Sequence, residues 1–298
     1  MSGDGVFFIG PQEAFRIEQD NPIKNNSIHD SMGMGLAETL EASIEDVVAT
    51  LRYPDSKSFR EFVEALSKIL DEARFEIGRD GVRVAGMDPA KIAYIEIWMP
   101  QDSFLEYSID EARESVYMGV RLESLVNALK KGKKGESVLF KVSDDKIFIQ
   151  VESAVVKRFL LPNIEVFIDV PENLTLEHDV EASVIAEAVK RAIKDVEVVG
   201  KDVEFEAEEG KLVIRAKAET RARVEAVLQE GVSSALLFLE VRKPSVSVYE
   251  VSYLKNVLNL TKIAEAVDIK FSSERPLEMV FKSPDGSRVR YLLAPSVA

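Results

Sequence analysis

The amino-acid sequence predicts an α+β fold in which helices lie on one side of antiparallel sheets. From Leu51 onward, an amphipathic helix followed by two short alternating strands recurs four times. The acidic residues of the four predicted turns, Asp80, Asp145, Glu209 and Glu274, lie 65, 64 and 65 positions apart. This period exceeds that of solenoid repeats, so each copy is a larger unit with its own helix and hairpin. Each helix has one apolar face and must therefore pack on a sheet.

The first two copies occupy the first half of the chain. In copy one, apolar residues at helical spacing run over 59–70, and two alternating strands flank the turn 78–81. In copy two, the helix covers 122–129 and the strands flank the turn 143–146. A period near 3.6 followed by a period of 2 is typical of a half-buried helix leading into half-buried strands.

The last two copies repeat this order in the second half. Copy three has a predicted helix over 185–193 and strands around the turn 208–211. Copy four is weaker, with a helix stripe over 254–261 and strands around the turn 272–276. The sequence therefore predicts two similar halves, each with two copies.

A segment without a clear period, residues 160–179, separates the two halves. It contains two prolines and several apolar residues, and we interpret it as a connector, although an ordinary edge strand with a loop would fit its composition. The predicted organisation is a leader over 1–46, an N-terminal domain over 47–160, an interdomain connector over 161–178 and a C-terminal domain over 179–298.

The leader has a composition of its own. It is rich in Asn, Gly, Ser and acidic residues, which is typical of disordered chain. Met32 and Met34 are alternative starts, in which case the leader is mis-annotated. We expect no folded domain in residues 1–46.

Several classes of protein are disfavoured by the composition. The chain has no cysteine, which excludes disulfides, thiolate nucleophiles and cysteine-ligated metals. It has no apolar run of membrane-spanning length and no secretory signal, so we expect a cytoplasmic protein that does not bind membranes. The two histidines, His29 and His178, have no ligand or nucleophile partner near them in the sequence and are interpreted as surface residues.

Two further motifs argue against an enzyme. The run KKGKKGES over 130–137 lacks the spacing of a phosphate-binding loop and is interpreted as a basic helix end with a glycine stop. Asp144 and Asp145 lie in a predicted hairpin turn, where carboxylates cap backbone N–H groups. We therefore expect no catalytic residues, no metal and no cofactor.

Charge is distributed unevenly along the chain. The net charge of −14 taken alone argues against binding to nucleic acid. The helix windows 57–71, 118–134, 181–195 and 247–265 nevertheless hold 13 basic against 9 acidic residues, while the remainder holds 25 against 43. The helices are the candidates for a phosphate-facing surface, although Lys and Arg also commonly solvate outer helix faces.

Five segments together resemble one known family. They are DEARFEIGRDGVRVAGMDPAKIAYIEI (71–97), YMGVRLESLVNALK (117–130), FIDVPE (167–172), SERPLEMVFK (273–282) and YLLAP (291–295). They are similar to the archaeal and eukaryotic sliding DNA clamps, the proliferating cell nuclear antigen family, over about residues 47–298. The resemblance implies a closed ring of three chains, each with two similar domains whose helices surround duplex DNA.

The resemblance also implies three sets of site residues. The DNA-facing set is Arg60, Arg121, Lys130, Lys131, Lys190, Lys194, Lys255 and Lys262. Of these, Arg121, Lys131 and Lys194 come from the charge of the predicted helices, and the other five match basic positions of the family. The groove that captures short partner peptides is Met87, Ile92, Ile168, Val170, Pro171, Pro276, Leu292, Leu293, Ala294 and Pro295, of which one or two, such as Met87 and Leu293, are instead core. The subunit interface pairs 154–160 with 219–227, through Val155, Lys157, Phe159, Arg221 and Arg223.

The chain departs from the family pattern in both binding sites. At four positions where relatives often carry a basic residue, this chain has Glu61, Ser67, Asn127 and Glu187. The inner surface of the ring, which faces DNA, is therefore expected to be less positive than in those relatives. Leu292 replaces a common aromatic residue and Ser296 a common lysine, which alters the expected peptide preference.

The function that the resemblance implies is that of a non-catalytic processivity factor. Its expected partners are duplex DNA, held without sequence preference, and a DNA polymerase, a flap nuclease, a DNA ligase and a clamp loader that bind through short peptides. The chain is expected to self-associate as a trimer and to lie at the nucleoid of an archaeon. Two alternatives stay open: a subunit of a heterotrimeric or damage-signalling clamp, and a nucleic-acid-processing enzyme with a groove built from the repeat.

Overall fold

The structure is a computed structural model of the chain. It describes residues 40–41, 43–130, 132–168, 170, 174–217, 222–229, 231 and 234–296. All of them belong to one compact unit, Thr39–Ala298. Every strand pair among these residues is antiparallel, which confirms the predicted α+β class.

The first half of this unit contains copies one and two of the repeat. Its elements are β1 (Ala49–Tyr53), α2 (Ser56–Ser67), β2 (Glu72–Gly78), β3 (Gly81–Met87), β4 (Ala93–Pro100), the 3-10 helix η1 (Gln101–Ser103), β5 (Glu106–Ile109), β6 (Ser115–Arg121), α3 (Leu122–Leu129), β7 (Val138–Val142), β8 (Lys146–Val151) and β9 (Lys157–Pro162). Asp55 starts α2, since its carboxylate accepts the Ser58 N–H at 2.7 Å.

The second half contains copies three and four. Its elements are β10 (Val180–Ile185), α4 (Ala186–Glu197), β11 (Asp202–Glu208), β12 (Lys211–Lys217), β13 (Arg223–Gln229), β14 (Leu236–Val241), β15 (Ser245–Glu250), α5 (Val251–Val257), the 3-10 helix η2 (Leu258–Lys262), β16 (Ala266–Phe271), β17 (Leu277–Lys282) and β18 (Arg288–Leu293). The helix of copy four is thus a short α-helix continued by a 3-10 turn, which explains its weaker periodicity.

Three of the helices begin directly where a strand ends. β6 leads into α3, β10 into α4 and β15 into α5, with no residue between them. The predicted windows 118–134, 181–195 and 247–265 therefore started too early, within the preceding strands. The apolar stripes themselves were closer: the helix predicted over 122–129 coincides with α3, and the one predicted over 185–193 begins one residue before α4. Arg121, predicted on a helix, is the last residue of β6.

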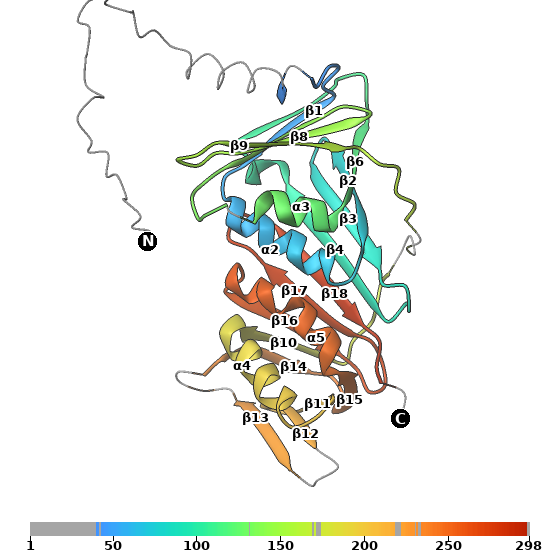
Figure 1. Ribbon diagram of the computed structural model, residues 1–298. Helices are drawn as coiled ribbons and strands as arrows, with labels where there is room; N and C mark the ends of the chain where they lie inside the picture. Colours follow the sequence, from blue (N-terminus) through green and yellow to red (C-terminus); the bar gives the residue numbers. More distant parts are fainter. Residues whose placement is uncertain are drawn as a thin grey trace, which may run out of the picture. The chain divides into compact units, whose positions relative to one another are not determined.

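The strands form three sheets. The order of the largest is β14-β10-β16-β17-β18-β4-β3-β2-β6, and the pair β18–β4 joins the two halves of the unit. The other two sheets run β5-β1-β7-β8-β9 and β13-β12-β11-β15. Figure 1 shows the sheets behind the helices, with β18 beside β4 at the junction. Long-range pairing therefore holds the two halves together.

The helices form one continuous row over the sheets (Figure 1). α3 contacts α2, α2 contacts η2, and α5 and η2 contact α4. Their apolar faces enter a single large core together with the inner faces of the strands. The predicted arrangement of helices on one side and sheets on the other is confirmed for this unit.

The predicted leader ends earlier than residue 46. Glu41 forms an ion pair with Lys141 at 2.6 Å, and the Lys146 ammonium donates to the Ser43 carbonyl at 3.2 Å. Ile44 is buried. Residues 41, 43 and 44 thus contact the folded unit, at β7 and β8 of the five-stranded sheet, through interactions that composition does not reveal. Residues 1–39, on which the rest of the leader prediction falls, lie outside the described residues.

Candidate functional site

The predicted DNA-facing residues lie along the helix row, with one exception. Lys130 follows the last residue of α3, Lys190 and Lys194 are on α4, and Lys255 and Lys262 are on α5 and η2. Arg121 instead ends β6, where its side chain is 75% exposed and pairs with Glu72 at 3.3 Å. Lys131 lies outside the described residues.

Arg60 is bound within its own half rather than extended into solvent. Its guanidinium donates to the carbonyls of Lys130 at 2.9 Å and Gly132 at 3.4 Å, and it pairs with Glu64 at 3.3 Å. Carbonyls at the end of a helix lack intrahelical partners, so a guanidinium stabilises them. Arg60 therefore joins α2 to the end of α3.

Lys262 is engaged by a buried carboxylate. Its ammonium contacts the two Glu61 oxygens at 2.9 and 3.0 Å, and the side chain of Glu61 is only 2% exposed. The Asn259 amide donates to the Glu61 carbonyl at 2.7 Å. Because Glu61 is on α2 and the other two residues are on η2, this cluster ties the helices of the two halves together. The departure at Glu61 from the family pattern thus has a structural role.

The remaining basic residues differ in how far they are neutralised. Lys190 pairs with Glu187 at 3.1 Å, and Lys255 pairs with Glu197. Lys130 and Lys194 are exposed, and within the described residues no ion pair joins either of them to an acid. An exposed, unpaired ammonium is the group best suited to contact a phosphate.

One basic residue on this face was missed by the sequence analysis. Lys68 follows α2, and burial lowers its pKa, an effect that the coulombic attraction of Glu64 opposes. It lines a hollow of about 440 Å³ with Tyr253 and Asn256 of α5. A charge count along the chain gives no signal that distinguishes Lys68 from other solvated lysines.

The predicted peptide groove corresponds to a second apolar cluster, separate from the main core. Its buried members are Ala85, Tyr94 and Leu292, and Met87 and Val170 pack against them from the outside. Leu174 and Leu176 of the connector pack there as well. Strand pairing brings these residues together, since Tyr94 lies opposite both Leu292 and Met87.

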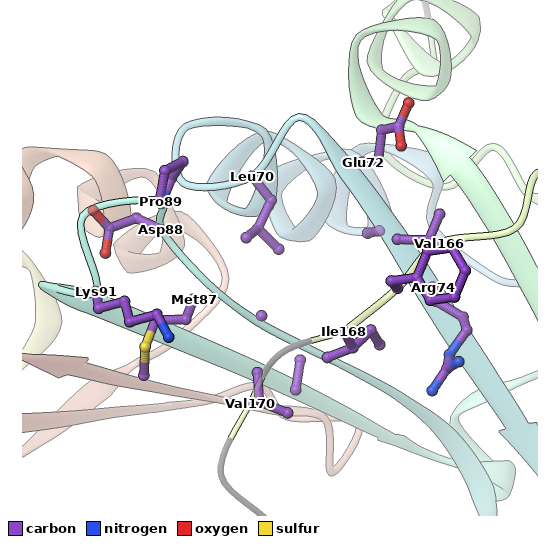
Figure 2. Close-up of a pocket in the computed structure, with 14 residues that line it drawn as sticks. Leu70, Glu72, Arg74, Met87, Asp88, Pro89, Lys91, Val166, Ile168 and Val170 are labelled. Carbon is purple, nitrogen blue, oxygen red and sulfur yellow. The ribbon is translucent and has the colours of Figure 1, made fainter.

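A cavity extends from this cluster under the first part of the connector. Its volume is about 320 Å³, and Leu70, Met87, Val166, Ile168 and Val170 are among its lining residues. Figure 2 shows Ile168 and Val170 on the connector facing Met87 and Leu70 across the hollow. The predicted residues Met87, Ile168 and Val170 therefore share one cavity, whose lining also includes the charged residues Glu72, Arg74, Asp88 and Lys91.

The rim of this site is held by a buried carboxylate. Asp88 accepts the backbone N–H groups of Ile92 at 2.7 Å and Ala93 at 2.6 Å, which closes the loop between β3 and β4. Ile92, predicted in the groove, packs instead against the main core at this loop. The carboxylate thus fixes the position of the neighbouring Met87.

The chain end contributes unevenly to the groove. Leu292 faces the second cluster, whereas Leu293 is fully buried in the main core, because successive strand residues point to opposite faces. The Ala294 N–H donates to the Ile92 carbonyl at 2.9 Å, which anchors the tail beside the loop. Leu293 therefore follows the core alternative that the sequence left open.

A second hollow lies where the described chain ends. It has a volume of about 910 Å³ and is lined by residues that include Val246, Val248, Pro295 and Ser296. Of the other predicted groove residues, Pro276 is half-buried just before β17 and lines neither hollow. Pro171 lies outside the described residues.

Both ends of the connector are fixed to sheets. At its start, the Gly119 N–H donates to the Asn163 side chain at 2.8 Å, and the Ile164 N–H donates to the Gly119 carbonyl at 3.0 Å. A Cβ at residue 119 would lie 1.8 Å from the Ile164 carbonyl oxygen, so only glycine allows this approach. The groove wall is therefore positioned by the backbone of β6.

At its other end, the connector is held by a cluster of charged residues. Arg290 donates to the Leu174 carbonyl at 2.6 Å and to Glu278 at 2.9 Å, and His178 lies 3.4 Å from Glu278. Burial raises the pKa of Glu278, but the hydrogen bonds from His178 and Arg290 outweigh it and lower the pKa to about 2. His178, expected on the surface, is buried because it joins this cluster.

The predicted interface residues lie at the open edges of two sheets. Lys157 and Phe159 are in β9, the last strand of the five-stranded sheet, and Arg223 is in β13, the last strand of the four-stranded sheet. Val155 is exposed just before β9. Arg221 lies outside the described residues.

The described residues carry few groups suited to other chemistry. No three His, Asp or Glu side chains among them gather as a metal site. None of the helices there has the length and apolarity to cross a membrane. Asp144 and Asp145 lie in the β7–β8 turn as predicted, but Asp144 binds Arg113 at 2.6 Å and Asp145 accepts from the Ser143 hydroxyl at 2.9 Å, rather than capping backbone N–H groups.

Comparison with known proteins agrees with the predicted family. The family model of the proliferating cell nuclear antigen N-terminal domain matches residues 49–159. The chain is 48% identical to DNA polymerase sliding clamp 1 of Aeropyrum pernix over 242 residues, which cover 81% of this chain and 98% of that relative. It is 30% identical to the sliding clamp of Pyrococcus furiosus over 250 residues, 82% of this chain and 97% of that one.

Solved structures match the fold over the same part of the chain. The crystal structure of PCNA from Thermococcus kodakaraensis superposes with a TM-score of 0.76 at 25% identity, covering 83% of this chain and 100% of that chain. A chain of the PCNA2–PCNA3 complex from Sulfolobus tokodaii gives the same score and identity, over 83% of this chain and 98% of that chain. The chain therefore belongs to the proliferating cell nuclear antigen family, the family of the DNA polymerase sliding clamps.

Proposed function

We propose that this protein is a DNA polymerase sliding clamp that encircles duplex DNA and tethers replication and repair enzymes to it. The observation that carries the proposal is the way in which its strands are grouped. Each half of the unit holds a group of five strands and a group of four strands, and only one group of each half is joined to the other half. The other two groups end in open edges.

The joined groups indicate what the open edges are for. Within the chain, the five-strand group that ends at β18 pairs with the four-strand group that begins at β4. By the repeat, β9 corresponds to β18 and β13 corresponds to β4. Pairing β9 of one chain with β13 of the next would therefore build the same nine-stranded sheet between chains. An open strand edge is a ready template for such pairing.

Such pairing is head-to-tail and closes into a ring when its rotation allows. Three subunits, the number that the family resemblance implies, would place six similar domains around the hole. The helix row of each chain would then line the inside, since the helices cover one face of the unit (Figure 1). The sheets would form the outside.

A ring of this kind needs only weak contacts with DNA. Phosphate contacts by Lys and Arg are independent of sequence and allow sliding. Exposed lysines of the helix row, Lys130 and Lys194 above all, would make these contacts. The acidic remainder of the chain, whose net charge is −14 overall, would repel DNA from the outer surface.

Partner enzymes would bind at the apolar site beside the connector. An aliphatic and an aromatic side chain on one helical turn of a short peptide would enter the site formed by Met87, Ile168, Val170 and Leu292. We propose that a DNA polymerase, a flap nuclease, a DNA ligase and a clamp loader use this site. The protein would act inside the cell as a platform without chemistry of its own.

Topological retention on DNA tests the proposal. The protein would be loaded by a clamp loader onto a nicked circular plasmid and separated from free protein on a sizing column. We expect it to stay with the circle and to leave after the circle is linearised, because a ring slides off a free end. Equal retention on circular and linear DNA would contradict encirclement.

One observation keeps a heterotrimeric clamp as a second candidate. The solved relative from Sulfolobus tokodaii is a complex of two different clamp chains, PCNA2 and PCNA3. The same retention test separates the candidates, since a heterotrimeric subunit alone would not stay on the circle and would do so once its partner chains are added.

A further inference from the structure

We propose that Arg74, which lines the cavity beside the connector, binds an acidic side chain of the partner peptide, so that the groove favours peptides that carry Asp or Glu next to their apolar turn. The inference rests on the proposed function, which places the peptide in the groove that contains Met87 and Ile168. It adds to that groove a charged subsite made by Arg74 and Tyr117.

The position of Arg74 places it beside the path of a bound peptide. Arg74 and Met87 both line the cavity. Figure 2 shows them at opposite ends of the hollow, with Ile168 of the connector between them and Val166 beside Arg74. A peptide whose apolar side chains enter at Met87 and Ile168 therefore brings the neighbouring residues of its chain towards Arg74.

The Arg74 guanidinium has no acceptor within the part of the chain that the structure describes. Its Nε is buried and lacks a hydrogen-bond partner, and no carboxylate there forms an ion pair with it. A buried donor without an acceptor is costly, so an acceptor supplied by a ligand is favoured. The residue as a whole is only half-buried, so a ligand can reach the outer part of the guanidinium.

The acidic residues on the same face of β2 already have basic neighbours. Glu72, Arg74 and Glu76 point to one face of the strand because side chains alternate along it. Glu72 pairs with Arg121 at 3.3 Å, and Glu76 lies opposite Arg83. Figure 2 shows the Glu72 carboxylate directed away from the Arg74 guanidinium. Arg74 is therefore the residue of this row whose charge is left for a ligand.

Tyr117 of β6 holds the guanidinium in place. Arg74 lies opposite Gly119, which has no side chain to obstruct it, and its guanidinium carbon lies 4.8 Å from the centre of the Tyr117 ring. Stacking of this kind uses the face of the guanidinium and leaves the N–H groups in its plane free to donate. The Tyr117 side chain is 48% exposed, so the stacked pair stands at the surface.

A carboxylate is the ligand that this arrangement fits. The planar guanidinium presents parallel N–H groups that match the two oxygens of Asp or Glu. A neutral acceptor, such as a Gln side chain, has the same reach but gains nothing from the charge of Arg74. The comparison of Glu with Gln at one peptide position therefore isolates the subsite.

A peptide series tests the inference. The parent is a fluorescent peptide carrying the clamp-binding segment of a family DNA polymerase, and each residue on either side of its apolar turn is replaced in turn by Glu and by Gln. We expect a position at which Glu binds about fivefold more tightly than Gln, as for a partly exposed ion pair. Added salt should reduce this preference. Equal affinities for Glu and Gln at every position would overturn the subsite.

Variants of the chain assign the preference to Arg74. R74Q should remove the difference between the Glu and Gln peptides, and R74E should favour Lys over Glu at the same peptide position. The control R83Q changes an arginine on the neighbouring strand that pairs with Glu96 at 2.6 Å and does not line the cavity, so it should keep the preference. A preference for Glu that persists in R74Q belongs to another cation of the cavity, such as Lys91, and would overturn the assignment.

Tyr117 is tested as a positioning residue by the same ratio of affinities. Y117F keeps the ring and should keep the preference for Glu, whereas Y117A should lose most of it because the guanidinium is no longer held. Equal preference in Y117F and Y117A would overturn this positioning role.

The peptide series also separates the subsite from the proposed function. A native chain that binds the parent peptide but treats Glu and Gln alike overturns the subsite and leaves the groove in place. A native chain that binds none of the peptides contradicts the peptide-binding role of the groove itself.

Discussion

Glu61 is an acidic residue on the helix row, at a position where relatives are expected to carry a basic residue. Its buried carboxylate holds Lys262, whose side chain is 50% exposed, across the junction between the two halves. A buried charge is stable only when it is paired and hydrogen-bonded. Glu61 therefore strengthens the contact between α2 and η2, and in the proposed ring the same contact would withdraw Lys262 from DNA.

Replacing Glu61 separates these two effects. Glu61→Gln removes the charge but keeps the shape, and we expect the free energy of unfolding to fall by about 1–3 kcal/mol because the hydrogen-bonded ion pair is removed. Urea unfolding measures this. The matched control is Glu64→Gln, which disrupts the more exposed Arg60–Glu64 pair and should change stability by less than about 0.5 kcal/mol. Equal destabilisation in the two variants would contradict the structural role of Glu61.

Glu278, in the charged cluster that holds the end of the connector, should make the stability of the protein depend on pH. Its folded-state pKa of about 2 lies below the value of about 4.3 expected for an unfolded chain. A carboxyl with a depressed pKa contributes stability above its unfolded pKa, and this contribution is lost as the pH falls from about 4 towards 2. The contribution is on the order of 2–3 kcal/mol. Urea unfolding at a series of pH values should show this loss in the native protein and a flatter profile in Glu278→Gln; parallel profiles would contradict the assignment.

The residues of the groove were predictable only in part. Met87, Val170 and Leu292 were named from the family resemblance and lie in the second apolar cluster. Tyr94 was missed, since its membership depends on its register opposite both Met87 and Leu292. Leu293 was placed in the groove, but a single strand position decides whether a side chain faces the groove or the core.

At the scale of elements, hydrophobic periodicity located the helices and hairpins of all four copies. It succeeds there because α2, α3, α4 and the strands that follow them each bury one face. It gives little signal for β13 and β14, whose residues are mostly exposed or half-buried. The order of the strands was not predictable from periodicity either, because β18 pairs with β4, for example Leu293 with Ala93, 200 positions earlier in the chain.

The groove is formed by β3, β4, β18 and the connector together. Its proposed role in binding peptides can be tested by changing one of its side chains. Met87→Ala removes the apolar side chain shared by the cluster and the cavity. We expect the affinity for a fluorescent peptide carrying the clamp-binding segment of a family DNA polymerase to fall about tenfold, which is about 1.4 kcal/mol. The native mass should not change.

The control for this prediction is an apolar residue outside the groove. Leu105 is exposed between η1 and β5, and Leu105→Ala should bind the peptide as the native chain does. Fluorescence anisotropy measures both variants. A similar fall in affinity in the two variants would show that the peptide does not use the site formed by Met87, Ile168 and Val170.

At the scale of the whole molecule, the distribution of charge explains how an acidic protein can hold DNA. The helix windows are the basic part of a chain whose net charge is −14. Several of their basic residues are already paired with acids, as Lys190 is with Glu187 and Lys262 with Glu61. The ring should therefore touch DNA through few phosphate contacts and depend on closure for its retention.

The unpaired lysines should have a specific effect on DNA binding. The double variant K130A/K194A should flatten the dependence of DNA affinity on salt, by about 0.9 in the logarithmic slope for each phosphate that the protein no longer neutralises. Titration of a labelled duplex across a salt series measures this slope. The control K211A changes a lysine at the β11–β12 turn that pairs with Glu208 at 3.2 Å, away from the helix row. An unaltered slope in the double variant would argue against a DNA-facing role for α3 and α4.

The central claim is that copies of this chain alone close into a ring. The most direct test is the native mass of the purified protein by light scattering across a concentration series. We predict a mass close to three times the chain mass of 33.2 kDa, falling only at high dilution. A chain that stays monomeric at every concentration would contradict self-closure.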